Sequence, residues 1–251
     1  MAPPLAIVRL SERPDLRGAI FGPEIQSAVP EFMRHDATAE LYYGAGQLDD
    51  YLDFVLAAFD PAEPARPLAR ACCVPFAWRG ELPDGGWDAV IRWGRQDRLA
   101  GRRADAVSAL EIMVAPRMQG SGVARAMLAA MCDNARRFGF RELWAPLRPT
   151  EKEREPEAAF AEYCARRRAD GLPADAWVRT HVRAGATIVK PAPCSMTIAG
   201  TLAEWRKWTG LAFDRSGAAL VPGALVPIHV SLEQDHAVYV EPNLWVRHEL
   251  S

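Results

Sequence analysis

The residues with the clearest chemical signature form a glycine-rich segment in the middle of the chain, Gln119-Gly120-Ser121-Gly122-Val123-Ala124. Two glycines this close together let the backbone approach a ligand and turn several N–H groups toward one point. A helical pattern of apolar residues follows at once, so the free N–H groups and the positive dipole end of a helix would face the same point. The segment therefore predicts a binding site for an anion such as a pyrophosphate.

Other phosphate-binding loops fit this segment less well. A Walker loop requires Gly-Lys-Ser/Thr, which the sequence lacks. A dinucleotide fingerprint requires its glycine turn directly after a strand and a third small residue in register. Here residues 115–119 intervene before Gly120, and Arg125 occupies the third position. A glycine-rich connection that binds nothing remains as the alternative.

The elements that must position this segment follow from the spacing of apolar residues. Residues 107–114, Val-Ser-Ala-Leu-Glu-Ile-Met-Val, are typical of a buried strand. Apolar residues recur at helical spacing over 122–138, and Gly139 occupies the position of a C-terminal cap. Residues 140–147 predict a second strand. The charged run 151–155 is expected to be a solvated loop.

The same reasoning outlines the rest of the chain. It predicts strands at 5–10, 51–59, 68–78, 186–190, 195–198, 224–232 and 237–246, and helices at 87–100, 157–168 and 176–184. The strands around the proline-rich turn at 60–67 form an antiparallel hairpin. Asp175 is a good N-cap, and Thr201 with Glu204 forms a capping box. Since no linker or repeat interrupts the pattern, we expect residues 1–251 to form a single domain.

Composition narrows the class of protein. A formal charge of −2 over 251 residues argues against a general nucleic-acid binder. The five cysteines are odd in number and form no Cys-x-x-Cys pair, and the five histidines show no ligand spacing, so we expect neither a disulfide framework nor a metal site. No apolar run is long enough for a membrane span. The first residues lack the basic segment followed by an apolar segment that is typical of a signal peptide. The sequence predicts a cytoplasmic protein.

The strand, the short loop with a proline, and Gln-Gly-x-Gly-x-Ala opening a helix together resemble the acyl-CoA-binding motif of the GNAT superfamily of N-acetyltransferases. Gln119, Gly120, Gly122 and Ala124 occupy its four defining positions. The resemblance is specific over residues 107–147, fair over 175–190 and loose over 5–80. Residues 81–106, 149–174 and 191–251 look like additions to the family core.

The resemblance implies an α/β fold of the α+β type. Its mixed, largely antiparallel central sheet would be flanked by helices, with a core of about 5–190 and further C-terminal strands and helices over 191–251. Edge strands in this family often pair between subunits, so a homodimer is compatible with it.

For function, the resemblance implies transfer of an acetyl group from acetyl-CoA to the amine of a small-molecule acceptor by direct attack on the thioester, with no metal. Backbone N–H groups of Ile112, Met113 and Val114 would hold the pantetheine arm and polarise the carbonyl. The segment from Gln119 to Ala124, with Ser121 and Val123 included, would hold the pyrophosphate. Neither a nucleic acid nor a membrane is implied as a partner.

A general base must take a proton from the attacking amine, and Glu111 is the candidate. It is a carboxylate inside an otherwise apolar strand, where desolvation could bring its pKa toward the working pH. Two alternatives stay open: the side chain points out of the sheet into solvent, or it pairs with an arginine.

The leaving thiolate also needs a proton. The family commonly places a tyrosine four residues before the glycine that ends the short helix, and counting back from Gly185 gives His181. A histidine could act as the acid, or it could pack beside Trp177 with a satisfied hydrogen bond. Tyr163 and Tyr239 are reserve candidates by residue type alone.

Two further functions are compatible with the same residues. One is an acyltransferase that uses a longer acyl-CoA. The other is a catalytically inactive module that binds acyl-CoA as a sensor or partner, an idea that the missing tyrosine supports. The polar residues between 227 and 241 would border the acceptor site in this family, although the alternating sides of an edge strand explain them as well.

Overall fold

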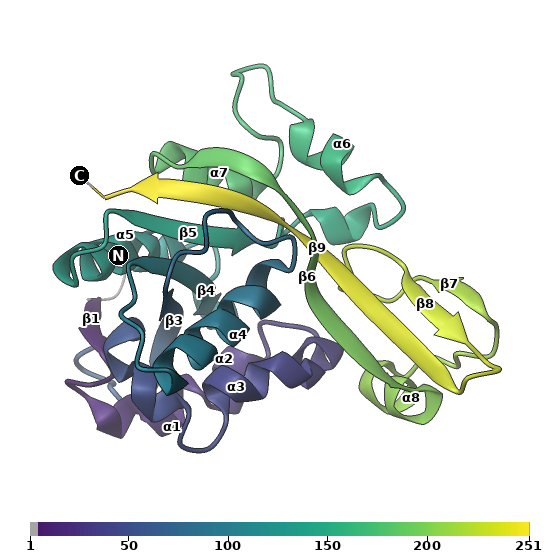
Figure 1. Cartoon of the computed structure of the whole chain (residues 1–251), viewed down its shortest axis with the longest axis horizontal. Coiled ribbons are helices and arrows are strands. Elements are labelled where there is room, and N and C mark those ends of the chain that lie inside the picture. Colours follow the sequence, from purple (N-terminus) through teal and green to yellow (C-terminus); the bar gives the residue numbers. More distant parts are fainter. Residues whose placement is uncertain (1–4, 251) are drawn as a thin grey trace.

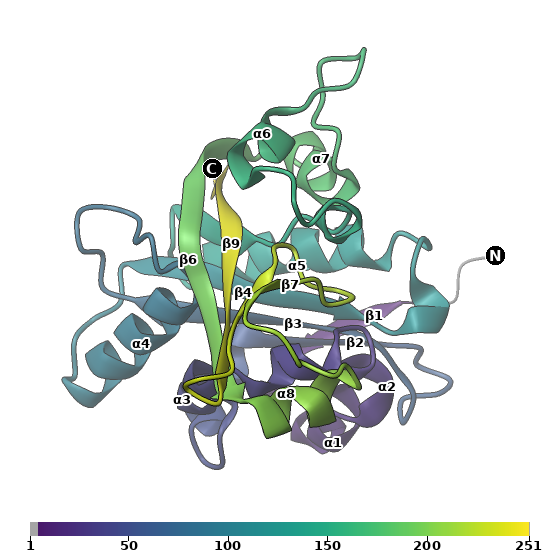
Figure 2. The same cartoon turned by 90° about the vertical axis from the view of Figure 1, so that its right-hand side faces the viewer.

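The computed structural model describes residues 5–250, which form one mixed sheet with helices on both faces (Figures 1 and 2). Its strands in this range are β1 (Ala6–Arg9), β2 (Val55–Phe59), β3 (Pro67–Phe76), β4 (Ala106–Val114), β5 (Glu142–Leu147), β6 (Thr187–Thr201), β7 (Gly217–Ala219), β8 (Ile228–Ser231) and β9 (His236–Glu249). The strand order is β1-β2-β3-β4-β5-β9-β8-β7, and β6 pairs with the other edge of β9. Neighbouring strands run antiparallel except β4 and β5, which are parallel. The mixed, largely antiparallel sheet predicted from the sequence is confirmed.

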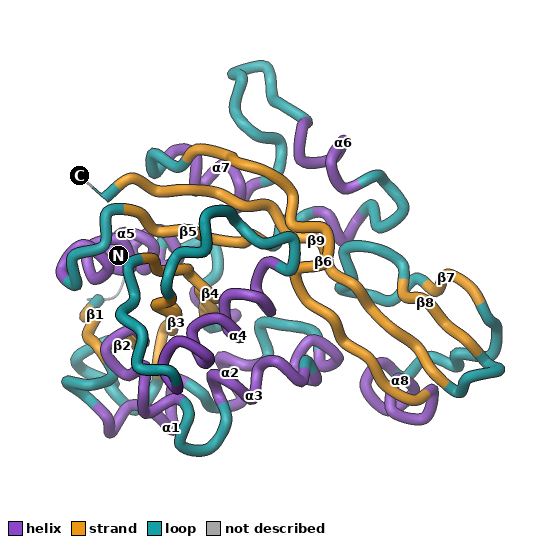
Figure 3. The backbone as a smooth tube through the Cα atoms, in the orientation of Figure 1, coloured by secondary structure: helices purple, strands orange, loops and turns teal. Residues whose placement is uncertain are grey.

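The helices fall into two layers. They are α1 (Arg17–Ile20), α2 (Pro23–Gln26), α3 (Glu40–Tyr43), α4 (Gly86–Leu99), α5 (Val123–Arg137), α6 (Phe160–Ala165), α7 (Ala176–Arg183) and α8 (Leu202–Thr209). Figure 2 shows α1 to α4 below the central strands and α5 with α7 above them. The N-terminal helices are single turns joined by loops, as the tube in Figure 3 shows.

The sheet is sandwiched because its central strands are apolar on both faces. Successive side chains of a strand point to opposite faces. On β3, Cys72 and Val74 join the core beneath α4, while Ala71 and Cys73 join the core beneath α5. This explains why the segment has no alternation of apolar and polar residues.

Strand β6 is longer than the sequence predicts. Two strands are expected at 186–190 and 195–198, separated by prolines, but one strand runs from Thr187 to Thr201. Its pairing with β9 shifts in register between Ala192 and Met196, beside Pro191 and Pro193. Because β6 has a partner on one edge only, prolines in a bulge cost few ladder hydrogen bonds.

The C-terminal residues contribute to the main sheet. Strand β9 lies between β5 and β6 over its second half and between β8 and β6 over its first half. In Figure 1 the ribbon of β6 and β9 extends from the main body to β7, β8 and α8. Over residues 5–250, no helix is long and apolar enough to cross a membrane.

Candidate functional site

The site begins where β4 and β5 separate. These parallel strands pair only at Val107 with Leu143 and Ser108 with Trp144, near the start of both. Beyond that point β4 keeps its partner β3, and β5 keeps its partner β9. The diverging halves leave one edge of β4 without a strand beside it, so backbone groups on that edge are available to a ligand.

A bulge in β4 sets which side chains face this opening. Cys72 pairs with Glu111 and Cys73 with Ala109, so Leu110 has no residue opposite it. Its carbonyl accepts a hydrogen bond from the indole Nε1–H of Trp87, 3.0 Å away, in the first turn of α4. The extra residue re-aims the strand at Glu111.

The open edge of β4 can be assigned residue by residue. The N–H of Ala115 donates to the Leu68 carbonyl at 2.9 Å, so Ala115 faces β3. In an antiparallel ladder the residues alternate, which turns Met113 toward β3 as well. Ile112 and Val114 therefore present their N–H and carbonyl groups to the opening. Of the three residues expected to hold the pantetheine arm, these two have the required direction.

The glycine-rich segment continues from this edge into α5. Gly120 and Gly122 have φ values of +77° and +90°, in the left-handed region that favours glycine. A Cβ atom at either would meet nothing within 4 Å, so backbone conformation and not space explains these glycines. The first turn of α5 leaves its N–H groups without backbone partners, as expected at a helix start. They lie at the positive end of the dipole of this 15-residue helix, an arrangement that can bind an anion.

One cavity of about 1260 Å³ joins the loop to the sheet. Its lining includes Gln119, Gly120 and Ala124 from the glycine-rich segment and the start of α5, and Glu111, Ile112, Met113 and Val114 from β4. It also includes Tyr43, Trp87, Arg148, Glu153, His181, Glu241 and Asn243 from other elements. Ser121, Gly122 and Val123 belong to the loop but are not among the lining residues. The cavity is large enough for a cofactor arm and a small second reactant.

Glu111 lies in the cavity wall and forms an ion pair with Arg70. Its Oε1 is 2.6 Å from Arg70 Nε, and its Oε2 accepts from Arg70 Nη2 at 3.4 Å. The thiol of Cys72 also donates to Oε1 at 3.4 Å. The side chains of Arg70 and Glu111 are 7% and 19% exposed. The arginine partner left open by the sequence is thus present, and both carboxylate oxygens are engaged.

His181 lies on α7 and is buried against two aromatic rings. It contacts Trp177 edge to face at 4.6 Å, and its Nδ1 is 2.9 Å from Nε2 of His248, on β9. Its second nitrogen, Nε2, is buried and has no hydrogen-bond partner within residues 5–250. Burial, together with the neighbouring His248 ring, lowers the pKa of His181 to about 3. Such a low pKa favours the neutral ring at physiological pH.

The hydroxyl groups of the two reserve candidates, Tyr163 and Tyr239, both have hydrogen-bond partners. The Tyr163 hydroxyl donates to Asp175 at 3.1 Å, and the Tyr239 hydroxyl donates to Glu241 at 2.8 Å. Glu241 is fully buried and also accepts from Arg148 Nε at 3.0 Å. Neither tyrosine is among the residues that line the cavity, and both hydroxyl groups are held by these bonds.

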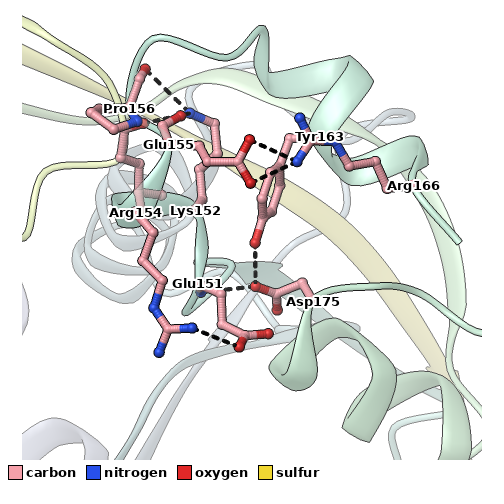
Figure 4. Close-up of polar contacts among 9 residues, drawn as sticks. Glu151, Lys152, Arg154, Glu155, Pro156, Tyr163, Arg166 and Asp175 are labelled. Carbon is pink, nitrogen blue, oxygen red and sulfur yellow. Dashed lines mark hydrogen bonds and ion pairs between the residues drawn. The ribbon is translucent and has the colours of Figure 1, made fainter. Parts of the chain in front are cut away.

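The segment between β5 and α7 is anchored by a buried lysine, which corrects the expectation of a fully solvated charged run. Lys152 is 0% exposed, and its Nζ donates to the carbonyls of Glu155, Pro156 and Leu225 at 2.6, 3.2 and 2.8 Å. Figure 4 shows this ammonium group beside the contacts of Tyr163 and Asp175. Three carbonyl partners satisfy all three of its protons, which makes burial of the charge tolerable.

The same segment fixes the start of α7. Asp175 caps the helix by accepting from the N–H groups of Trp177 and Val178, as predicted. Its other oxygen accepts from the N–H of Glu151 at 2.9 Å, and the Glu151 carboxylate accepts from the N–H of Ala176 at 3.0 Å. This reciprocal pair of bonds ties the start of α7, the helix that carries His181, to the segment after β5. Figure 4 shows Glu151 beside Asp175.

Comparison with known proteins identifies the family. Residues 40–164 match the family model described as "Acetyltransferase (GNAT) family". The whole chain aligns, at 31% identity and over 96% of the relative's length, with "Arginine N-acetyltransferase avaD" of Aspergillus versicolor. The chain belongs to the GNAT family of acetyltransferases. The resemblance drawn from the glycine-rich motif and the expectation of an N-acetyltransferase are both confirmed.

A solved structure supports the fold of this acetyltransferase. The loading GNATL domain of CurA from Lyngbya majuscula superposes with a TM-score of 0.58 at 13% identity, covering 98% of this chain and 97% of that domain. The match covers the C-terminal strands as well as the motif. At this identity the likeness concerns the fold alone.

Several residues in or next to the acetyltransferase cavity were not singled out from the sequence. Tyr43 comes from a one-turn helix without apolar periodicity, and its buried hydroxyl has no hydrogen-bond partner among the residues that the structure describes. His248 and Glu241 are placed by the pairing of β9 with β5 and β6. Glu241 lies at the end of the polar stretch 227–241, which the sequence analysis gives as a possible border of the acceptor site. Nothing local to the sequence marks Tyr43 or His248.

Proposed function

We propose that this acetyltransferase transfers the acetyl group of acetyl-CoA to an amine nitrogen of arginine. The observation that carries the proposal is the full-length similarity, at 31% identity, to a protein named an arginine N-acetyltransferase. The charges and rings of the cavity support a cationic acceptor.

Acetyl-CoA would occupy the half of the cavity next to the glycine-rich loop. The free N–H groups at the start of α5 suit the pyrophosphate, and side chains matter little there. The open edge at Ile112 and Val114 suits the amide groups of the pantetheine arm, which would add to the sheet as a short strand does. This arrangement brings the thioester toward Glu111 and His181.

The charged residues that line the cavity favour a cation. Four arginines and four glutamates line the cavity. Arg70 and Arg148 pair with Glu111 and Glu241, whereas Arg17 and Arg34 pair with carboxylates outside the lining, namely Asp49 and Glu31. Within residues 5–250, the two remaining lining carboxylates, Glu40 and Glu153, have no ion-pair partner. A bound guanidinium group could give such a carboxylate an ion-pair partner.

Three aromatic rings line the same cavity as these charged residues. The rings of Tyr43 and Trp87 are nearly parallel, at 16° with centroids 6.4 Å apart, and Phe21 meets Tyr43 edge to face at 6.1 Å. All three residues line the cavity. A planar guanidinium group stacks well on such faces. We propose that they orient the side chain of the acceptor while Glu111 orients the attacking amine.

The test is release of free CoA thiol from acetyl-CoA, with the acetylated product identified by mass spectrometry. Arginine should be acetylated, and citrulline, its uncharged isostere, should show a kcat/KM at least about tenfold lower, because tenfold corresponds to about 1.4 kcal/mol of lost charge recognition. Glu40→Gln and Glu153→Gln should raise KM for arginine and leave KM for acetyl-CoA unchanged. Glu157→Gln, an exposed site outside the cavity, is the matched control.

Two outcomes would contradict the proposal. If arginine is inert while another amine reacts, the acceptor is wrong. If acetyl-CoA binds and no amine in a broad panel accelerates thiol release, the chain acts as an acyl-CoA sensor. Replacing acetyl-CoA with butyryl-CoA in the same assay tests the longer acyl donor.

A further inference from the structure

Arg148 follows β5 directly, lines the cavity and uses only part of its hydrogen-bonding capacity within the protein. Its Nε donates to Oε2 of Glu241 at 3.0 Å, and its Nη2 donates to the carbonyl of Gly223. Its third nitrogen, Nη1, has no hydrogen-bond partner within residues 5–250 and is not buried. The side chain is 26% exposed. The guanidinium group is therefore fixed at two nitrogens and can still donate two hydrogen bonds to a ligand.

The carboxylate that pairs with Arg148 is fixed by further donors. Oε2 of Glu241 also accepts from the Tyr239 hydroxyl at 2.8 Å, and Oε1 accepts from Nδ2 of Asn243 at 3.0 Å. Oδ1 of Asn243 accepts from the Ser195 hydroxyl at 2.6 Å. Glu241 and Ser195 are both fully buried. Because this network holds the guanidinium group in place before any ligand binds, less entropy is lost on binding.

The position of Arg148 separates it from the expected pyrophosphate site. Arg148 follows the end of β5, whereas the glycine-rich segment follows the end of β4, and these two strands pair only near their starts. Glu241 belongs to β9, which pairs with the edge of β5 that faces away from β4. We therefore expect Arg148 to meet the second reactant and not the phosphates of acetyl-CoA.

The chemistry of the wall around Arg148 suits the head group of an amino acid. A guanidinium group forms charge-assisted, often paired hydrogen bonds with a carboxylate. Glu153, in the 3-10 turn that follows β5, lines the same cavity and has no ion-pair partner within residues 5–250. Arg148 and Glu153 thus offer one positive and one negative group to a carboxylate and an ammonium. Glu40 is then left for the guanidinium end of the acceptor.

We propose that Arg148 is a specificity-determining residue that binds the carboxylate of the acceptor. The enzyme would then select a free α-amino acid over an amine that lacks this group. The inference rests on the proposed function and adds the recognition of the other end of arginine. Nη1 donates to the carboxylate, while Nε and Nη2 keep their bonds to Glu241 and Gly223. Arg148 exchanges no proton in the acetyl transfer.

The kinetic test compares arginine with argininamide, which has a neutral amide in place of the carboxylate. In thiol release, wild-type kcat/KM should be at least about tenfold higher for arginine. Arg148→Lys keeps a positive charge for Glu241 but loses the guanidinium fork, so this preference should fall below about threefold. Differences in the intrinsic reactivity of the two amines cancel between the enzymes. Arg166→Lys makes the same exchange at an exposed arginine that pairs with Glu155 outside the cavity, and it should behave as the wild type.

A second variant separates selectivity from folding. Removing Arg148 alone would leave the buried carboxylate of Glu241 unpaired, whereas Arg148→Met combined with Glu241→Gln removes both charges. This double variant should also lose the preference for arginine and keep its KM for acetyl-CoA. A preference that survives in both variants would refute the role of Arg148. A raised KM for acetyl-CoA with an unchanged KM for arginine would assign Arg148 to a phosphate of the cofactor and overturn the proposal.

Calorimetry distinguishes failure of this inference from failure of the proposed function. Enzyme saturated with CoA, which has no acetyl group to transfer, is titrated with arginine or with argininamide. Arginine should bind at least about tenfold more tightly, and Arg148→Lys should abolish the difference. If arginine binds in this way but is never acetylated, the proposed function fails and the carboxylate site stands. Equal affinities, or no binding of either compound, would refute the carboxylate site.

Discussion

Because His181 is buried as a neutral ring, the free energy of unfolding should fall at acid pH by an amount that can be calculated. An unfolded histidine has a pKa of about 6.5, whereas burial and then His248 lower the pKa of His181 to about 3. Between these values the unfolded state binds one more proton than the folded state, so the free energy of unfolding falls as the pH falls. At about 1.4 kcal/mol per pH unit, lowering the pH from 7 to 5 removes about 2 kcal/mol through this residue.

Urea unfolding of the wild type and of His181→Phe, each at pH 7 and pH 5, measures this contribution. Groups that titrate in both proteins cancel in the comparison, including carboxylates whose effect has the opposite sign. The variant should lose about 2 kcal/mol less than the wild type between the two pH values. The control His229→Gln, altered at an exposed site, should behave as the wild type. An equal loss in wild type and His181→Phe would show that His181 is not held neutral by the fold.

Three further perturbations test other parts of the structure. Burial, aided by Asp36, raises the pKa of Asp88 to about 8, so the folded state binds the extra proton and the contribution of Asp88 to stability falls by about 2 kcal/mol from pH 6 to pH 8. In urea titrations the change in stability over this interval should therefore be about 2 kcal/mol more favourable for Asp88→Asn than for the wild type. Gly122→Ala should lower the free energy of unfolding by about 1–2 kcal/mol because Gly122 has a positive φ, and it should still bind acetyl-CoA in calorimetry. Gly122→Glu should weaken acetyl-CoA binding at least about tenfold. Equal affinities of the two variants for acetyl-CoA would argue against the anion site. Lys152→Met should lower the free energy of unfolding by about 2 kcal/mol, because the carbonyls of Pro156 and Leu225 lose their donor while that of Glu155 still accepts from the N–H of Ala158. An unchanged thermal midpoint would contradict the anchoring role of Lys152.

The parts of the fold that could be predicted are those with local patterns. The strand at 107–114, the glycine-rich turn and the helix after it appear within a residue or two of their expected bounds as β4 and α5. Their spacing is dictated by period-two and helical burial within a short window. The caps at Asp175 and Thr201 were predictable for the same reason, since each is a bond between residues two or three positions apart.

The parts that could not be predicted depend on distant pairing. The N-terminal helices are single turns of four residues, too short to show periodicity. The ion pair of Arg70 with Glu111 requires the register of β3 on β4, and the contact of His181 with His248 requires β9 beside β5 and β6. A single sequence does not determine the register of β3 on β4 or the position of β9 beside β5 and β6. The residue types of Glu111 and His181 were informative, but their partners determine what each can do.

The position of β9 also has a consequence for how the protein assembles. Leu147 of β5 pairs with Leu244 of β9, so closing this wall joins residues roughly a hundred positions apart, the kind of contact that forms late in folding. The β2–β3–β4 meander and α5 can associate earlier because their partners are closer in the chain. An emerging polypeptide can therefore form the glycine-rich loop while β9, which carries Glu241 and His248, is still missing. The cavity, whose lining includes Glu241 and Asn243 of β9, becomes complete only after this strand is synthesised and has paired with β5 and β6.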